Sequence, residues 1–112
     1  MNQNIQHSFK ALADPTRRQI LMHLSQQNMT IAEVTDQFDM TRAAIKKHLN
    51  ILESGHLISV KTNGRERVNT LETQGLQTIT DWLGYFDQFW DKKINRLQEV
   101  IADNANNENK RK

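Results

Sequence analysis

Two short amphipathic helical patterns that follow one another almost without a break constrain the fold of this chain more than any other feature. The first begins at Thr30, an N-cap residue type, and Glu33 three positions later completes a capping box. The second begins at Thr41, which also favours a helix N-cap. Only Asp39 and Met40 lie between the two patterns, and this arrangement is typical of a helix-turn-helix.

The second helix of this pair has an apolar face and a basic face. With a turn of about 100° per residue, the stripe that we expect to face the core consists of Ile45, Leu49 and Leu52. The broadly opposite face combines cationic and small residues, namely Arg42, Ala43, Lys46, Lys47 and Asn50, with His48 at the border. Lysine and arginine can donate to guanine O6 and N7 or to phosphate, and Ala43 admits close approach or contact with a thymine methyl group. Such a surface is typical of a helix that enters the major groove.

The apolar period changes from helical to strand-like after Gly55, which takes the position where a left-handed residue would end the helix. Residues 57–62 and 65–71 predict two strands, and Asn63-Gly64 between them is a strong signal for a tight hairpin turn. Arg65 follows directly, so we expect it at the tip of a wing, where it can enter a narrow minor groove.

Basic residues gather in the middle of the chain. Residues 41–67 hold six of the fifteen Lys and Arg residues but only two of the thirteen Asp and Glu residues. Such a block is the electrostatic footprint of a site for a polyanion. The expected DNA contacts in this block are Thr41, Arg42, Ala43, Lys46, Lys47 and His48 on the helix, and Arg65 and Arg67 on the hairpin.

Another helix is predicted to begin at Pro15, directly after Asp14. Asp14 suits its N-cap and Pro15 suits its first turn. Arg17 and Arg18 would oppose the helix dipole there. Either a DNA phosphate compensates that cost, in which case Arg17 joins the DNA contacts, or both arginines are simply solvated.

Together these patterns predict a mostly α-helical fold with a small β-hairpin wing, a winged helix-turn-helix. The expected order is helices over about residues 5–13, 15–25, 30–39 and 41–54, strands over 57–62 and 65–71, and one long helix over 73–102. We expect residues 1–103 to form one domain for DNA binding and dimerisation, and the polar tail 104–112 to be disordered. The basic end of that tail, Lys110, Arg111 and Lys112, is either solvated or in contact with phosphates.

The composition argues against several classes of protein. The chain has no cysteine, which excludes disulfides and thiolate metal sites. No signal peptide and no apolar run of roughly 20 residues is visible, so we expect a cytoplasmic protein without a membrane segment. No nucleophile stands beside a base and no glycine loop could cradle a phosphate, so no enzyme is expected. A pure protein-interaction module would keep no basic helix face, which this chain has.

Large apolar side chains crowd the last predicted helix. They are Trp82, Phe86, Phe89, Trp90, Leu97 and Ile101. The core of so small a domain cannot absorb them all, and an exposed row of such side chains marks an interface. We therefore expect a homodimer interface at Trp82, Phe86, Phe89, Trp90 and Leu97. The alternative is that these aromatic residues also line a pocket for an apolar ligand.

Several of these segments resemble those of a known family. The segment from Phe9 to Leu21, FKALADPTRRQIL, resembles the opening signature of the ArsR-type winged-helix repressors. Residues 40–58 look like the recognition-helix signature of that family, and Gly64-Arg65 is similar to its wing tip. The resemblance covers about residues 5–102. It implies a homodimer that binds an inverted-repeat operator and represses transcription, usually of its own gene.

The same resemblance raises the question whether this protein senses a metal ion. Many members bind metal through cysteines on the third helix or through histidines and carboxylates on the last helix. This chain has no cysteine and no histidine after residue 56, so we expect no metal and no cofactor, although an unusual site at His7 or His23 stays open. A small-molecule or protein effector stays open as well. The segment Trp82–Trp90 resembles the metal-independent, SdpR-like branch, whose terminal and first helices pair across the dimer, which adds Phe9 to the expected interface.

Overall fold

The computed structural model describes residues 3–110, with side chains over residues 5–105. Its contacts divide the chain into two compact units that meet between Thr80 and Asp81. The single domain expected over residues 1–103 stays a prediction. We describe each unit by itself and call them the N-terminal and the C-terminal unit. Within residues 3–110, every helix is too short or too polar to cross a membrane.

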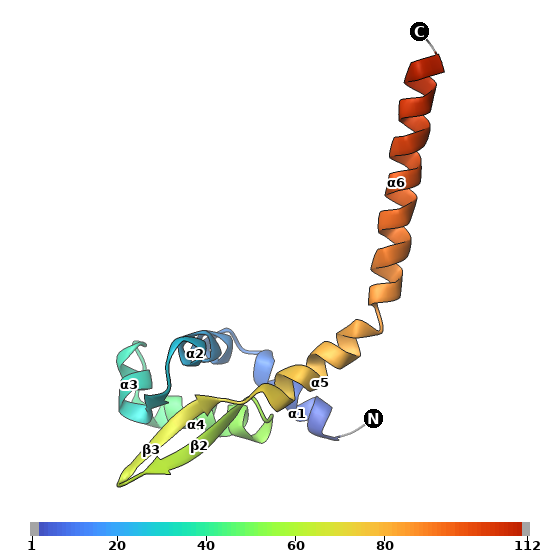
Figure 1. The fold of residues 1–112 in the computed structure, drawn as a ribbon. Coiled ribbons are helices and arrows are strands. Elements are labelled where there is room, and N and C mark those ends of the chain that lie inside the picture. The colour runs from blue at the N-terminus through green and yellow to red at the C-terminus, as the bar shows by residue number, and fades with distance from the viewer. Residues whose placement is uncertain (1–2, 111–112) are drawn as a thin grey trace. The chain divides into compact units, whose positions relative to one another are not determined.

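The chain is mostly helical with one small antiparallel sheet, and the predicted winged helix-turn-helix class is confirmed (Figure 1). The elements are α1 (Gln3–Leu12), α2 (Pro15–Gln26), β1 (Met29–Thr30), α3 (Ile31–Asp36), α4 (Arg42–Ser54), β2 (Ile58–Asn63), β3 (Glu66–Leu71), α5 (Thr73–Gly84) and α6 (Asp87–Lys110). The strands lie in the order β1-β3-β2. Strand β1 was not predicted, because two residues are too few to show a period.

One apolar core holds the N-terminal unit together. Its most deeply buried large side chains, each less than 2% exposed, include Ile20, Val34, Ile45, Leu52 and Leu57. They come from α2, α3, α4 and the residue before β2, so every element of the helix-turn-helix contributes to the same core. The apolar stripe predicted for α4, including Leu49, is confirmed as its buried face.

The N-caps predicted at Asp14, Thr30 and Thr41 are confirmed. The Asp14 carboxylate accepts from the Arg17 amide at 3.0 Å, and the Thr41 hydroxyl accepts from the Ala44 amide at 3.1 Å. Thr30 and its partner three residues later form the capping box in both directions. Helix α3, however, ends at Asp36 rather than near residue 39, because its last amides bond three residues back and tighten the final turn.

The hairpin turn lies one residue later than predicted. Asn63 pairs with Glu66 across the hairpin, so the two loop residues are Gly64 and Arg65. Gly64 has a φ of 66°, which fits the first central position of a type II′ turn. Arg65 therefore belongs to the turn itself and stands at the tip of the wing.

The end of α4 differs from the sequence-based expectation in one residue. Gly55 has an ordinary φ of −86°, whereas His56 has a φ of 57° and is the left-handed residue. The His56 amide bonds the Glu53 carbonyl and the Leu57 amide bonds the Leu52 carbonyl, which is the Schellman pattern. Gly55 is needed for space instead, because a Cβ there would lie 2.8 Å from the His7 carbonyl oxygen of α1.

The final helical region is broken where one long helix was predicted. Helix α5 ends at Gly84, and the amides of Tyr85 and Phe86 bond three residues back before α6 begins. Glycine weakens a helix interior, which explains a break at this position. Helix α6 then continues to Lys110, so residues 104–110, which were expected to be disordered, are helical in the structure. Helix extension adds one bond per residue, which outweighs the poor propensity of asparagine. The side chains of the basic tail lie outside the described residues.

The end of α4 gives a stability test. We expect Gly55→Ala to lower the free energy of unfolding by about 1–3 kcal/mol, because the added methyl group meets backbone that cannot shift cheaply. The matched variant His56→Gly relieves a left-handed residue and should change it by less than about 1 kcal/mol. Chemical denaturation measures both, and equal stabilities for the two variants would contradict the close approach of α1 and α4.

Candidate nucleic-acid interface

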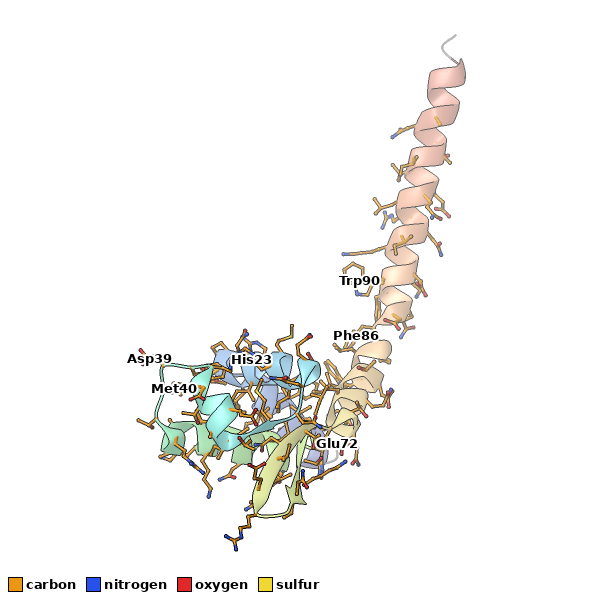
Figure 2. The ribbon with its side chains drawn as sticks, turned by 60° about the vertical axis from the view of Figure 1, so that its left-hand side comes forward. His23, Asp39, Met40, Glu72, Phe86 and Trp90 are labelled. Atoms are coloured by element: carbon orange, nitrogen blue, oxygen red, sulfur yellow. The ribbon has the colours of Figure 1, made fainter. Side chains whose placement is uncertain are left out.

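Helix α4 exposes the face that the sequence predicts to be basic. Arg42, Ala43, Lys46 and Lys47 are exposed, as is the capping residue Thr41. The opposite face is held in the core, so the helix can rotate very little about its axis. Asp39 and Met40 lie in the turn that leads into it (Figure 2).

A groove of about 450 Å³ lies between α4, the start of α3 and the β2–β3 hairpin. Four cationic side chains line it, two from the helix and two from the hairpin: Arg42, Lys46, Arg65 and Arg67. Two carboxylates, Glu53 and Glu66, line it as well, so the groove keeps a positive balance. The fold therefore gathers the helical and hairpin cations of the basic block around one concave surface.

The exposed residues of α4 form two stripes. Arg42, Lys46 and Asn50 follow one another at intervals of four and all line the groove. Ala43 and Lys47 are exposed beside that stripe and are not among the groove-lining residues. Asn50 was not among the expected DNA contacts, although its spacing of four from Lys46 is visible in the sequence.

The structure places the Arg17 guanidinium against backbone carbonyls of the protein itself, whereas the sequence left open a DNA contact or a solvated side chain. Arg17 is only 9% exposed, and its guanidinium donates to the carbonyls of Ala11 at 2.9 Å and Lys10 at 2.8 Å. Arg18 donates to the Leu12 carbonyl at 2.7 Å. Both arginines therefore donate to carbonyls at the C-terminus of α1, where cations also interact favourably with the helix dipole.

His48 is half-buried at the border of the basic face. Its Nδ1 lies 3.3 Å from Arg17 Nη1 and 3.9 Å from Asp14 Oδ2. The Arg17 amide, which donates to the Asp14 carboxylate, lowers the pKa of Asp14 below its ordinary value, and the positive charge of Arg17 acts in the same direction. These three residues thus tie α4 to the junction of α1 and α2.

Four aromatic residues of the C-terminal unit, Trp82, Tyr85, Phe86 and Phe89, form a cluster on their own segment. The ring centres of Trp82 and Phe86 are 4.9 Å apart, and those of Tyr85 and Phe86 are 5.1 Å apart. Phe86 and Trp90 are labelled in Figure 2. All the expected interface residues of this unit are exposed in the single chain, including Phe89 and Leu97, whereas Phe9 on α1 is half-buried.

Potential metal ligands are scattered over the described part of the chain. Among those residues, no group of three or more His, Asp or Glu side chains could hold a metal ion. His23 packs its ring edge-to-face against Phe38 with centres 5.6 Å apart, and His7 is an exposed residue of α1. Nothing in this arrangement favours the unusual site at either histidine.

Comparison with known proteins places this fold in a family. Residues 14–60 match the family described as "Bacterial regulatory protein, arsR family". The chain is also 37% identical over 75 residues to the transcriptional repressor SdpR of Bacillus subtilis, covering 67% of this chain and 83% of that protein. The chain belongs to the ArsR family. It is therefore a DNA-binding transcriptional regulator and not an enzyme.

Solved structures support the same assignment. An ArsR-like transcriptional regulator from Rhodococcus sp. superposes with a TM-score of 0.70 and 26% identity, over 88% of this chain and 92% of that one. A homodimeric winged helix-turn-helix DNA-binding domain from Mycobacterium bovis, a possible ArsR-family regulator, has a TM-score of 0.62 over 77% of this chain and 80% of that one. Its identity of 20% shows a common fold alone.

The groove gives a test of electrostatic contact. We expect Arg65→Ala to weaken binding to every duplex and to make the dependence of log affinity on log salt shallower by about one unit, because one phosphate contact is lost. Titration of a random-sequence duplex at several salt concentrations measures the slope. The control Lys10→Ala removes the same charge outside the groove and should leave it unchanged. An unaltered slope for Arg65→Ala would exclude a phosphate contact at the wing tip.

Proposed function

We propose that this ArsR-family chain is a sequence-specific repressor that acts in the cytoplasm as a homodimer on an inverted-repeat operator, including that of its own gene. The single observation that carries the proposal is the groove in which α4 and the wing present Arg42, Lys46, Arg65 and Arg67 together. The likeness to a relative named as a transcriptional repressor supports repression rather than activation.

In this proposal the two parts of the groove have different tasks. The stripe Arg42, Lys46 and Asn50 faces base edges in the major groove, where arginine and lysine select guanine and asparagine selects adenine. Thr41 and Lys47 flank that stripe and contact phosphates. Arg65 extends from the turn into the adjacent minor groove, where a narrow width concentrates negative potential. Helix contacts then determine sequence preference, and wing contacts mainly add affinity.

The dimer follows from the apolar surface of the C-terminal unit. On α6, Trp90, Ile94, Leu97 and Ile101 are spaced by four, three and four residues, which is the period of a coiled-coil seam. Trp90 is 65% exposed and Leu97 62% exposed in the single chain. A second copy presents the same seam, so the two surfaces can cover each other across a twofold axis. The N-terminal unit then binds DNA while α5, α6 and Phe9 of α1 hold the dimer.

We propose further that this repressor does not respond to a metal ion. The chain lacks cysteine, and its four histidines all precede residue 57. Neither the thiolate ligands of the third helix nor an imidazole on the last helices is available in the sequence. Release from DNA would then depend on a small-molecule or protein effector, or on the concentration of the dimer.

Selection of bound duplexes from a random pool tests the DNA-binding part. We expect an inverted repeat to emerge, because a symmetric dimer places two copies of α4 on equivalent half-sites. Arg42→Ala and Lys46→Ala should change the preferred bases as well as the affinity, whereas Arg65→Ala should retain the same preference. If both helix variants bound the selected operator as tightly as the unaltered protein, the assignment of α4 as the recognition helix would be wrong.

Sedimentation measures the dimer. We expect Trp90→Ala to weaken dimerisation at least about tenfold, because buried tryptophans are frequent hot spots of interfaces. The control is Met22→Ala, which removes an exposed apolar side chain from α2. An intact dimer of Trp90→Ala at low micromolar concentration would count against the seam on α6.

A further inference from the structure

The guanidinium of Arg17 makes three contacts in a site that is almost closed to solvent. Nε and Nη2 donate to two carbonyls at the end of α1, and Nη1 reaches His48 on α4 at 3.3 Å. Arg17 is thereby connected to α1, α2 and α4 at once. Because each contact uses a different nitrogen, the guanidinium plane has little freedom to turn away from the imidazole.

This contact determines which nitrogen of His48 carries the proton. A guanidinium has only N–H groups and does not lose its charge in proteins, so it can donate to the imidazole but cannot accept from it. His48 Nδ1 must therefore accept, which leaves a neutral ring with its proton on Nε2. The carboxylate of Asp14 is the competing partner that would hold a proton on Nδ1. It lies 3.9 Å away, beyond hydrogen-bonding distance, and it already accepts from the Arg17 amide.

The other ring nitrogen of His48 has no polar partner among the described residues. Within the described residues the only polar contacts of His48 are those of Nδ1 with Arg17 and Asp14. Its side chain is 19% exposed. Thr41 precedes His48 by seven residues, or two turns, so both lie on one side of α4. Thr41 is also a proposed phosphate contact.

We propose that Arg17 is a positioning residue that holds His48 in the Nε2–H tautomer. The uncharged imidazole then donates one hydrogen bond to a DNA phosphate beside α4. The second half of this inference rests on the proposed function. Arg17 then contributes to DNA binding without touching DNA, and His48 contributes a donor without adding a positive charge. The contact between Arg17 and His48 thus links the segment of residues 9–21 to the proposed recognition helix α4.

Nitrogen NMR reads the tautomer directly in the full chain. At pH 8, where an ordinary imidazole is neutral, long-range ¹H–¹⁵N correlations should show His48 protonated on Nε2 alone. His56, an exposed residue, is the internal control and should show a mixture of both tautomers. Arg17→Met should convert His48 to a mixture as well. A proton on Nδ1 of His48 in the unaltered protein would overturn the proposal, even if the Arg17 variant failed to fold.

Two substitutions of His48 test which of its two ring nitrogens contributes to the affinity for DNA. Glutamine places its amide near the position of Nε2, whereas asparagine places it near Nδ1. With a random-sequence duplex at low salt, we expect His48→Gln to bind within about twofold of the unaltered protein and His48→Asn to bind about tenfold more weakly, as for one lost hydrogen bond to a charged group. Equal affinities for the two variants would refute the phosphate contact.

The controls distinguish this inference from the proposed function. If the unaltered protein bound no duplex, the proposed function would fail and the phosphate contact with it, while the NMR measurement would still decide the tautomer. If the unaltered protein bound DNA but both His48 variants bound equally well, only the phosphate contact would fail. Thermal unfolding of both His48 variants shows whether a change in affinity reflects a change in stability, and His48→Asn should melt close to His48→Gln.

Discussion

The junction at the end of α4 holds the DNA-binding helix in place. Gly55 lets the backbone of α1 approach α4 closely, and the Ser8 hydroxyl donates to the Gly55 carbonyl at 2.7 Å. The His56 carbonyl accepts from the Gly75 amide at 2.8 Å, and a Cβ on Gly75 would collide with that backbone. Two glycines and one left-handed histidine thus bring three helices together. The direction of α4, and with it the position of every side chain on its exposed face, depends on this packing.

Arginines of the same chemistry have different tasks in this chain because their surroundings differ. Arg17 and Arg18 lie close to the carbonyl end of α1 and satisfy its backbone, so their charge is used within the protein. Arg42 and Arg65 are exposed and line an open groove. A guanidinium is available to a phosphate only where the fold leaves its donors uncommitted. The positive balance of the groove is therefore a property of the tertiary structure as well as of the composition.

The C-terminal unit differs from the N-terminal unit in how far its apolar side chains are buried. The N-terminal unit buries its apolar side chains around Ile45 and Leu52, whereas the apolar residues of α6 remain exposed in the single chain. Exposure of Trp90, Ile94 and Leu97 is costly in water, and a second molecule would remove that cost. In the proposed dimer, covering this seam removes exposed apolar surface and at the same time joins two DNA-binding units into one symmetric molecule.

The sequence by itself determined the helix-turn-helix, its caps and the basic face of α4, because capping and apolar periodicity are local signals carried by residues a few positions apart. It also placed the wing, although the turn lies one residue later. Only the tertiary structure decided which groups Arg17 contacts, which residue at the end of α4 is left-handed, and that strand β1 forms. Arg17 and strand β1 depend on partners distant in the chain: the Arg17 guanidinium reaches α4, and β1 pairs with Asn69. At the end of α4, contact with α1 requires glycine at position 55, whereas His56 is the residue with the left-handed conformation. A local pattern cannot show such partners, because they are neighbours only after the core has formed.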